Sequence, residues 1–148
     1  MAFVVSTLDK PCDEVVALVE FAIAGLPRTD VMEFRIKKTR IDSPYMFRGT
    51  AYCNRYTPHA RLIKDRRIVA TVSLGSDCWY PHKMYAVTLQ DWKDALVYLV
   101  AHEARHLDQK LSGRKLSKAG KESDAANFAL QKIAEFQRVR YANRRWFS

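Results

Sequence analysis

The strongest constraint on the fold is the helical spacing of apolar residues in the C-terminal part of the chain. Between Thr88 and Gly113 they recur three and four positions apart, which places them on one face of an α-helix. Thr88 fits the N-cap of this helix and Gly113 its C-terminal stop. The apolar face consists of Trp92, Ala95, Leu96, Leu99, Val100 and Leu107. A second long helix is expected to begin at Lys118 or Lys121 and to end near Asn143.

The first half of the chain predicts one helix and a small sheet. Cys12 to Ala24 has an amphipathic pattern, and Gly25 ends it. Three later segments have the alternation or the β-branched content of strands, and a short extended piece, Tyr85–Val87, follows them. The strand segments are Met32–Lys38, Gly49–Tyr56 and Arg67–Leu74. The expected fold class is α+β: an N-terminal helix, a small three- to four-stranded sheet and two C-terminal helices in a single domain over residues 1–148.

Composition places the chain among ordinary globular proteins, with 48% hydrophobic and 28% charged residues. Apolar runs fall short of a membrane span. The apolar start Met1–Val5 meets Asp9 and Lys10 before a signal-peptide core could form. The cysteines are odd in number and have no close pair, which favours reduced thiols; they are Cys12, Cys53 and Cys78. We therefore expect a cytoplasmic protein without membrane association.

His102 and His106 lie four residues apart inside the first C-terminal helix, and Glu103 follows His102 directly. This spacing puts both imidazoles on one helix face, one turn apart, where they can share one cation. A glutamate beside them can hold the metal-bound water and take its proton, which is the H-E-x-x-H arrangement. The alternative is two solvated or core histidines that happen to be one turn apart. The pattern predicts a zinc site with Glu103 as general base.

A catalytic zinc ion takes three protein ligands and keeps one open position, so a third ligand is expected beyond His106. The acidic candidates are Asp108, Glu122, Asp124 and Glu135. Asp108 points to a different side of the histidine helix, and Asp124 and Glu135 share a different stripe of the last helix. Glu122 shares the apolar, inward stripe formed by Ala125, Ala126, Ala129, Ile133 and Phe136. Glu122 is the predicted ligand; the alternative is a first-turn glutamate that only complements the helix dipole.

These motifs resemble those of a known family. His102-Glu103-x-x-His106 followed by Glu122-Ser123-Asp124-Ala125 resembles the gluzincin clan of HExxH zincin metallopeptidases, especially its compact minigluzincin members. Glu122-x-x-Ala125-x-x-Phe128-Ala129 is similar to the second-helix motif of ImmA/IrrE-type peptidases. The resemblance implies that His102, His106 and Glu122 are zinc ligands and that Glu103 is the general base. It also implies that the strand before the active-site helix, Arg67–Leu74, binds an extended peptide along its edge.

Two departures from the family pattern concern the surroundings of the ligands. Many gluzincins carry an aspartate four residues after the ligand glutamate, where this chain has Ala126. The partner of a ligand histidine is then expected elsewhere, at Asp108 or a backbone carbonyl. The interval from His106 to Glu122 is also short and leaves little room for an intervening lobe. Donors for a transition-state oxyanion stay open among Tyr80, His82, Tyr85, Arg140 and Tyr141.

The favoured function is therefore a zinc-dependent metallopeptidase acting on a protein or peptide substrate. A second class stays open because the net charge is +9 and the C-terminus mixes cations with aromatics, namely Arg138, Arg140, Arg144 and Arg145 with Tyr141, Trp146 and Phe147. The favoured alternative for this tail is an amphipathic helix end whose aromatics pack on the core while its arginines face solvent. The second class is a nucleic-acid-associated regulatory or binding protein with a structural or vestigial metal site. SprT-like proteases combine both features, as DNA-associated peptidases. A metal-dependent amidase acting on something other than protein is the third possibility.

Overall fold

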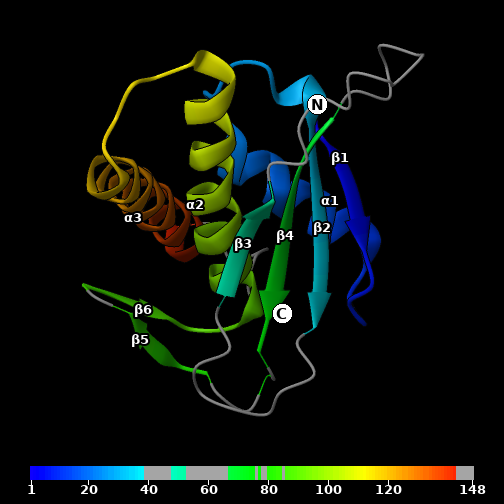
Figure 1. Ribbon diagram of the computed structural model, residues 1–148. Coiled ribbons are helices and arrows are strands. Elements are labelled where there is room, and N and C mark those ends of the chain that lie inside the picture. Colours follow the sequence, from blue (N-terminus) through cyan, green and yellow to red (C-terminus); the bar gives the residue numbers. More distant parts are fainter. Residues whose placement is uncertain (39–47, 53–66, 76, 78–79, 85, 143–148) are drawn as a thin grey trace.

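The computed structural model describes residues 1–38, 48–52, 67–75, 77, 80–84 and 86–142 and shows the predicted α+β class (Figure 1). Side chains are described for these residues except 48–52 and 84. Several residues named above lie outside the described part, namely Cys53, Tyr56, Cys78, Tyr85, Asn143, Arg144, Arg145, Trp146 and Phe147. Within the described residues, no helix is long and apolar enough to span a membrane.

The main sheet has the strand order β1-β2-β4-β3. β1 (Phe3–Ser6), β2 (Met32–Lys38) and β4 (Ile68–Leu74) are parallel, and β3 (Arg48–Tyr52) pairs antiparallel with β4. The three predicted strands are confirmed within the described residues, whereas β1 was not predicted. Because β4 pairs with a strand on each side, the prediction that Arg67–Leu74 offers a free edge to a peptide is wrong; the edges of the described sheet are β1 and β3.

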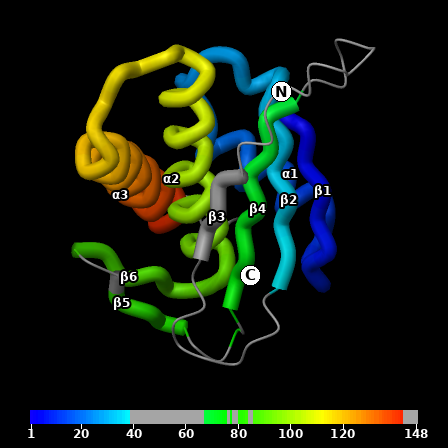
Figure 2. The backbone as a smooth tube through the Cα atoms, in the orientation of Figure 1, coloured from blue at the N-terminus to red at the C-terminus, as the bar shows by residue number. Residues whose placement is uncertain are grey.

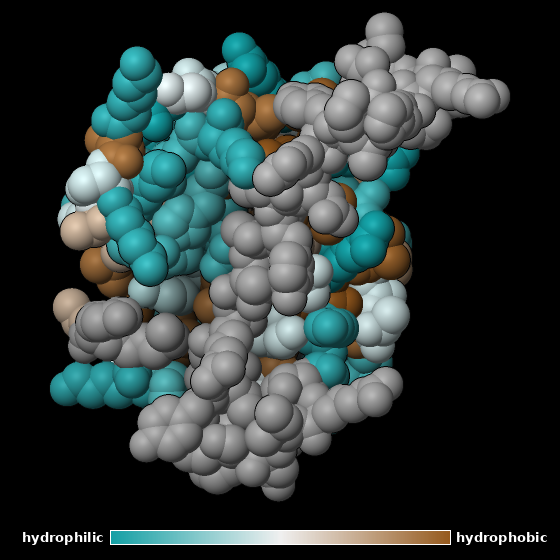
Figure 3. All heavy atoms as spheres, in the orientation of Figure 1, coloured by the Kyte–Doolittle hydropathy of each residue, from teal (hydrophilic) through white to brown (hydrophobic). Residues whose placement is uncertain are grey.

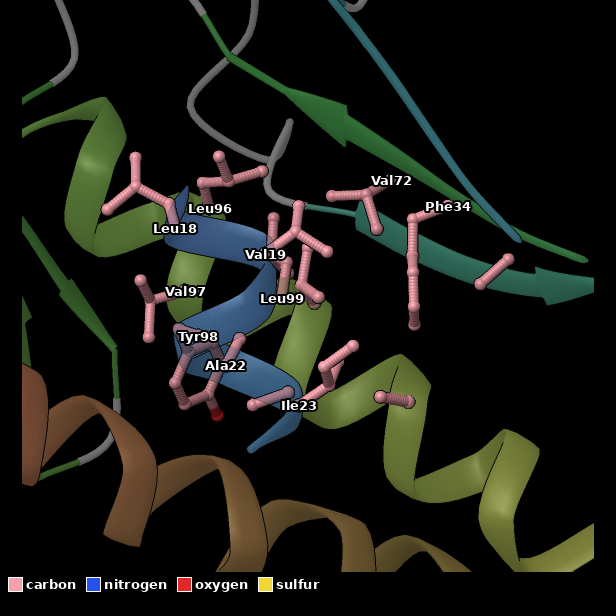
Figure 4. Close-up of a cluster of buried hydrophobic side chains, with 14 of the residues drawn as sticks. Leu18, Val19, Ala22, Ile23, Phe34, Val72, Leu96, Val97, Tyr98 and Leu99 are labelled. Carbon is pink, nitrogen blue, oxygen red and sulfur yellow. The ribbon is translucent and has the colours of Figure 1, made fainter. Parts of the chain in front are cut away.

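The hydrophobic core forms between the sheet and two helices, one that precedes β2–β4 in the chain and one that follows them. α1 (Cys12–Ile23) and α2 (Trp92–Ser112) lie on the same side of the sheet, and α2 packs against β3 and β4 (Figure 1). Figure 4 shows their apolar side chains meeting those of the central strands, with Leu18 and Val19 from α1, Leu96 from α2, Phe34 from β2 and Val72 from β4. All of these side chains are fully buried, so α2 is held firmly against the sheet.

The ends of α2 are fixed by two local motifs. At the C-terminus Gly113 adopts a left-handed conformation, with its N–H donating to the carbonyl of Lys110 and the N–H of Arg114 donating to Gln109. This is a Schellman motif, and it confirms the predicted stop. At the N-terminus the cap is Asp91. Its Oδ1 accepts hydrogen bonds from the backbone N–H groups of Lys93, at 3.1 Å, and Asp94, at 3.3 Å. The predicted cap Thr88 is wrong.

Thr88 instead belongs to a small hairpin that precedes α2. The hairpin pairs β5 (His82–Met84) antiparallel with β6 (Val87–Leu89). The predicted extended piece is therefore only partly right, because Ala86 lies in the turn and Val87 in a strand. The carbonyl of Thr88 accepts a hydrogen bond of 2.7 Å from the Gln137 side chain, which ties the hairpin to the last helix.

The last helix, α3 (Lys118–Ala142), returns along α2 after the short connection that follows Gly113 (Figure 2). Its first turns lie beside the C-terminal half of α2, because Asp124 bonds Arg105. Its last turns lie beside the start of α2, because Arg140 bonds Asp91 and Asp94. The close approach is made by the buried side chains Ala125, Ala129, Ile133 and Phe136. The two helices therefore form an antiparallel pair joined by polar contacts at both ends.

Candidate metal centre

Three side chains named by the sequence meet between α2 and α3. The Nε2 atoms of His102 and His106 lie 3.2 Å apart. Glu122, in the second turn of α3, places Oε2 3.3 Å from Nε2 of His102 and Oε1 3.1 Å from Nε2 of His106. Among the described residues, these three form a group of metal-ligand type whose ligand atoms lie within 4.8 Å of one another. We call His102, His106 and Glu122 the metal group.

The donor atoms of the metal group suit a zinc ion. Zinc bonds to imidazole nitrogen and carboxylate oxygen are about 2.0–2.1 Å long, so the ligand atoms of a tetrahedral site lie about 3.3 Å apart. The two imidazole nitrogens lie 3.2 Å apart, and each lies 3.1–3.3 Å from a different oxygen of Glu122. With one ligand atom taken from each residue, the three atoms lie within 4.8 Å of one another. Two nitrogens and one carboxylate are a donor set that suits zinc, so the residues present fit a zinc ion in their chemistry and lie close enough to share one cation.

The protonation of His102 also suits metal binding. Burial lowers the pKa of His102, and the neighbouring His106 ring lowers it further, while Glu122 opposes the shift. A lowered pKa keeps the imidazole neutral near pH 7, and only a neutral imidazole has a nitrogen lone pair for a metal. Both histidine side chains are partly exposed, and the Glu122 side chain is 61% exposed. The metal group is therefore reachable from solvent.

Hydrophilic residues gather on this face of the molecule, over α2 and its connection to α3 (Figure 3). Around the metal group they form a second layer of contacts. Nδ1 of His106 lies 3.0 Å from Oε1 of Gln109. Arg105 donates to Asp124 at 2.8 and 3.2 Å and to Asp108 at 3.4 Å. The metal group is thus backed by an ion-paired layer that also joins the two helices.

This second layer corrects one prediction. Asp108 or a backbone carbonyl is the expected partner of a ligand histidine, but Asp108 accepts from Arg105 in this layer, and Gln109 contacts His106 instead. Asp124 lies outside the metal group, as its stripe predicts, and it contacts Arg105 and Gln109 across the helix interface. Helix phase alone does not predict these contacts, because they depend on the long side chain of Arg105 on α2. Gln109 could have been found from its position one turn after His106.

Glu103, the predicted general base, follows His102 on α2, and its side chain is only 5% exposed. The excluded ligand candidate Glu135 lies far along α3, exposed and 4.0 Å from Lys132. The structure brings together the three predicted ligands, and it puts Glu103 at the adjacent helix position. The arrangement therefore combines a group of metal-ligand type with a buried carboxylate on the helix that carries its two histidines.

The candidate oxyanion donors differ in their burial and in their contacts. Arg140 is 4% exposed and bonds Asp91 and Asp94, so it belongs neither to an exposed basic tail nor to the metal group; we call these three residues the arginine cluster. Tyr80 is half-buried, and burial raises the pKa of its hydroxyl, with the charges of nearby aspartates adding to the effect. Tyr141 is exposed at the end of α3. Arg140 is thereby removed as an oxyanion donor, because both of its terminal nitrogens are engaged by carboxylates.

Comparison with known proteins adds no further assignment. No protein-family model, curated protein or solved structure matches this chain. The likeness to gluzincin metallopeptidases accordingly stays a prediction from the motif residues.

Proposed function

We propose that this chain is a zinc-dependent metallopeptidase with the metal group as its zinc ligands and Glu103 as its general base. The observation that carries the proposal is the convergence of His102 and His106 with Glu122 from a separate helix, at separations of 3.1–3.3 Å. Zinc sites with three protein ligands keep a position for substrate or water, which is typical of catalytic centres.

The zinc ligands and Glu103 have different roles in the proposed reaction. When bound, zinc polarises a substrate carbonyl and lowers the pKa of water. Glu103 accepts the proton of the attacking water as the new carbon–oxygen bond forms. It then passes that proton to the amine nitrogen as the carbon–nitrogen bond breaks. A carboxylate with little access to bulk solvent suits this transfer because it exchanges few protons with the solution.

Two features argue against a purely structural or vestigial metal site. Structural zinc sites are closed by four protein ligands, whereas the group found among the described residues has three. A structural site also does not need a glutamate at the position of Glu103. The same features are compatible with a metal-dependent amidase, which would share the ligands and the base. Substrate class therefore separates a peptidase from an amidase.

Exchanging Glu103 for glutamine tests the proposal. We expect Glu103→Gln to retain zinc and to lose hydrolysis of a fluorescently labelled unfolded protein by about 10²-fold or more, because general-base catalysis contributes this much. The matched control is Glu135→Gln, which alters an exposed glutamate on α3 and should keep full activity. Equal activity of Glu103→Gln and wild type would contradict the proposal. Hydrolysis of small amides without any cleavage of peptides would identify an amidase instead.

A second candidate function, association with nucleic acid, has its own observation. Residues 109–121 contain five Lys or Arg and no Asp or Glu, and all five cations are exposed: Lys110, Arg114, Lys115, Lys118 and Lys121. The exposed Arg138 adds to the positive charge of α3. Such a surface suits phosphate contacts next to the metal group. We propose a cytoplasmic protein that binds nucleic acid through the cations of residues 109–121 and through its basic C-terminus, as in a SprT-like DNA-associated protease.

Salt dependence tests this second candidate. Binding of a labelled single-stranded DNA should weaken steeply as salt rises, because each phosphate contact releases counterions. A double variant, Lys115→Ala with Lys118→Ala, should flatten the salt slope without changing zinc content. An Arg144→Ala and Arg145→Ala variant tests the C-terminus in the same way. Absence of measurable DNA binding at low salt would remove this candidate and leave a protease with a basic surface.

A further inference from the structure

Gln109 is a buried glutamine at the centre of the contacts behind the metal group. Its side chain is 3% exposed, and it lies on α2 one turn after His106. Its Oε1 lies 3.0 Å from Nδ1 of His106. Its Nε2 donates to the carbonyl of Lys121 and to Oδ2 of Asp124, each at 2.9 Å. Both ends of one amide are therefore engaged, one by the histidine helix and one by α3.

These contacts fix which way the amide of Gln109 faces. The Lys121 carbonyl can only accept hydrogen bonds, and the Asp124 carboxylate, held ionised by Arg105 at 2.8 Å, also only accepts. The group facing them must be the NH₂, so the oxygen faces His106. That oxygen is an acceptor, so it favours the tautomer of a neutral His106 ring that carries its proton on Nδ1, whereas Oε1 of Glu122, 3.1 Å from Nε2, competes for the same proton. With the proton on Nδ1, the lone pair of Nε2 is directed at the other two members of the metal group.

We propose that Gln109 is a positioning residue that holds His106 in its zinc-binding tautomer and, with Asp124, docks the start of α3 so that Glu122 reaches the same point. The inference rests on the proposed zinc site and deepens it. One amide contacts both helices that supply the ligands, so the same side chain acts on ligand protonation and, beside the Arg105–Asp124 ion pair, on ligand position.

The tautomer is measured directly in the metal-free protein from the ¹⁵N NMR shifts of the imidazole nitrogens. Wild-type protein should show His106 protonated on Nδ1. Gln109→Leu removes the acceptor, and a substantial Nε2-protonated population should appear. Gln109→Glu keeps an acceptor next to Nδ1 but sets a second carboxylate against Asp124. It should keep the tautomer and still weaken zinc binding, which separates the two roles of Gln109.

Zinc affinity, measured by competition with a chromophoric chelator, is the second readout. Gln109→Leu should weaken it by about 10- to 100-fold, as loss of the partner of a ligand histidine typically does. The chain provides a matched control in Gln137, whose Nε2 also donates to a backbone carbonyl, at 2.7 Å, and to an aspartate, at 3.0 Å, but at the other end of the helix pair. Gln137→Leu should lose comparable stability and keep wild-type zinc affinity.

Two results would overturn the role of Gln109. One is a metal-free wild-type protein in which His106 is protonated mainly on Nε2. The other is a folded Gln109→Leu protein that binds zinc as tightly as Gln137→Leu does. A wild-type protein that binds no zinc contradicts the proposed function instead, and the tautomer measurement, which needs no metal, then decides the effect of Gln109 on His106 alone.

Discussion

Two polar clusters join α2 to α3, one at each end of the helix pair, and they differ in what their charges do. In the arginine cluster, one buried guanidinium donates to two carboxylates, Asp91 at 2.7 Å and Asp94 at 2.8 Å. In the metal group, the two imidazole nitrogens lie 3.2 Å apart, and each lies 3.1–3.3 Å from one oxygen of the Glu122 carboxylate. Opposite charges that satisfy each other stabilise a fold, whereas lone pairs directed at one point favour a cation.

Exposure sharpens the contrast between the two ends. Asp94 is fully buried and Arg140 is 4% exposed, while the Glu122 side chain is 61% exposed. A buried ion pair is costly to break, because removal of one partner leaves an uncompensated charge. A ligand at the surface can be replaced with little effect on folding. We therefore expect stability to depend on the arginine cluster and metal binding on the metal group.

The largest expected effect on stability is that of Arg140→Met. This substitution leaves Asp91 and Asp94 without their cation, so the free energy of unfolding should fall by about 3–5 kcal/mol. Urea denaturation of the metal-free protein measures it. Arg138→Met, an exposed neighbour on the same helix, should change stability by less than about 0.5 kcal/mol. Equal losses in both variants would show that the arginine cluster does not stabilise the helix pair.

Zinc itself should have the next largest effect. A ligand that binds only the folded protein adds about 2.7 kcal/mol to the free energy of unfolding at a free concentration of 100 times its Kd. Wild-type protein should gain this stability in zinc, and Glu122→Ala should gain almost none while unfolding much like wild type without zinc. Thermal unfolding at several zinc concentrations is the measurement. A gain of equal size in Glu122→Ala would contradict the assignment of Glu122 as a ligand.

The smallest effect concerns acid. A hydrogen bond from Arg105 lowers the pKa of Asp124 from its usual 3.8 to about 2. A carboxyl group with a lowered folded pKa adds stability that is present above about pH 4 and is lost as the pH falls towards 2. Because Asp124 is partly exposed, the loss should be on the order of 1 kcal/mol. Asp124→Asn should flatten the dependence of urea stability on pH in this window; an unchanged slope would mean that the ion pair is solvated.

Local patterns were enough to predict most of the elements and the grouping of the three proposed ligands. The apolar spacing placed α1 and the strand β2 to within a residue at each end, and Gly113 gave the end of α2. The convergence of His102 and His106 followed from one helical turn, and Glu122 followed from helix phase. Such features depend on neighbours in the chain, so they are visible in the sequence.

Features that depend on distant partners were not predictable in this way. β1 is four residues long and half-exposed, and it pairs in parallel with β2, whose residues lie about 30 positions later in the chain. Asp91 displaced Thr88 as the cap of α2, while its carboxylate also binds Arg140 from the other end of the chain. The sequence groups Arg140 with the exposed basic tail, because the partners that bury it, Asp91 and Asp94, lie far from it in the chain. In each case a contact across the tertiary structure decided the outcome.

The central claim, that the metal group binds zinc, is tested most directly by metal content. Wild-type protein and His102→Ala are purified after expression with added zinc, dialysed, and analysed by inductively coupled plasma mass spectrometry, with circular dichroism to confirm folding. The account predicts about one zinc ion per chain in the wild type and almost none in His102→Ala. A wild-type protein that stays metal-free, or a His102→Ala protein that keeps its zinc, would contradict it.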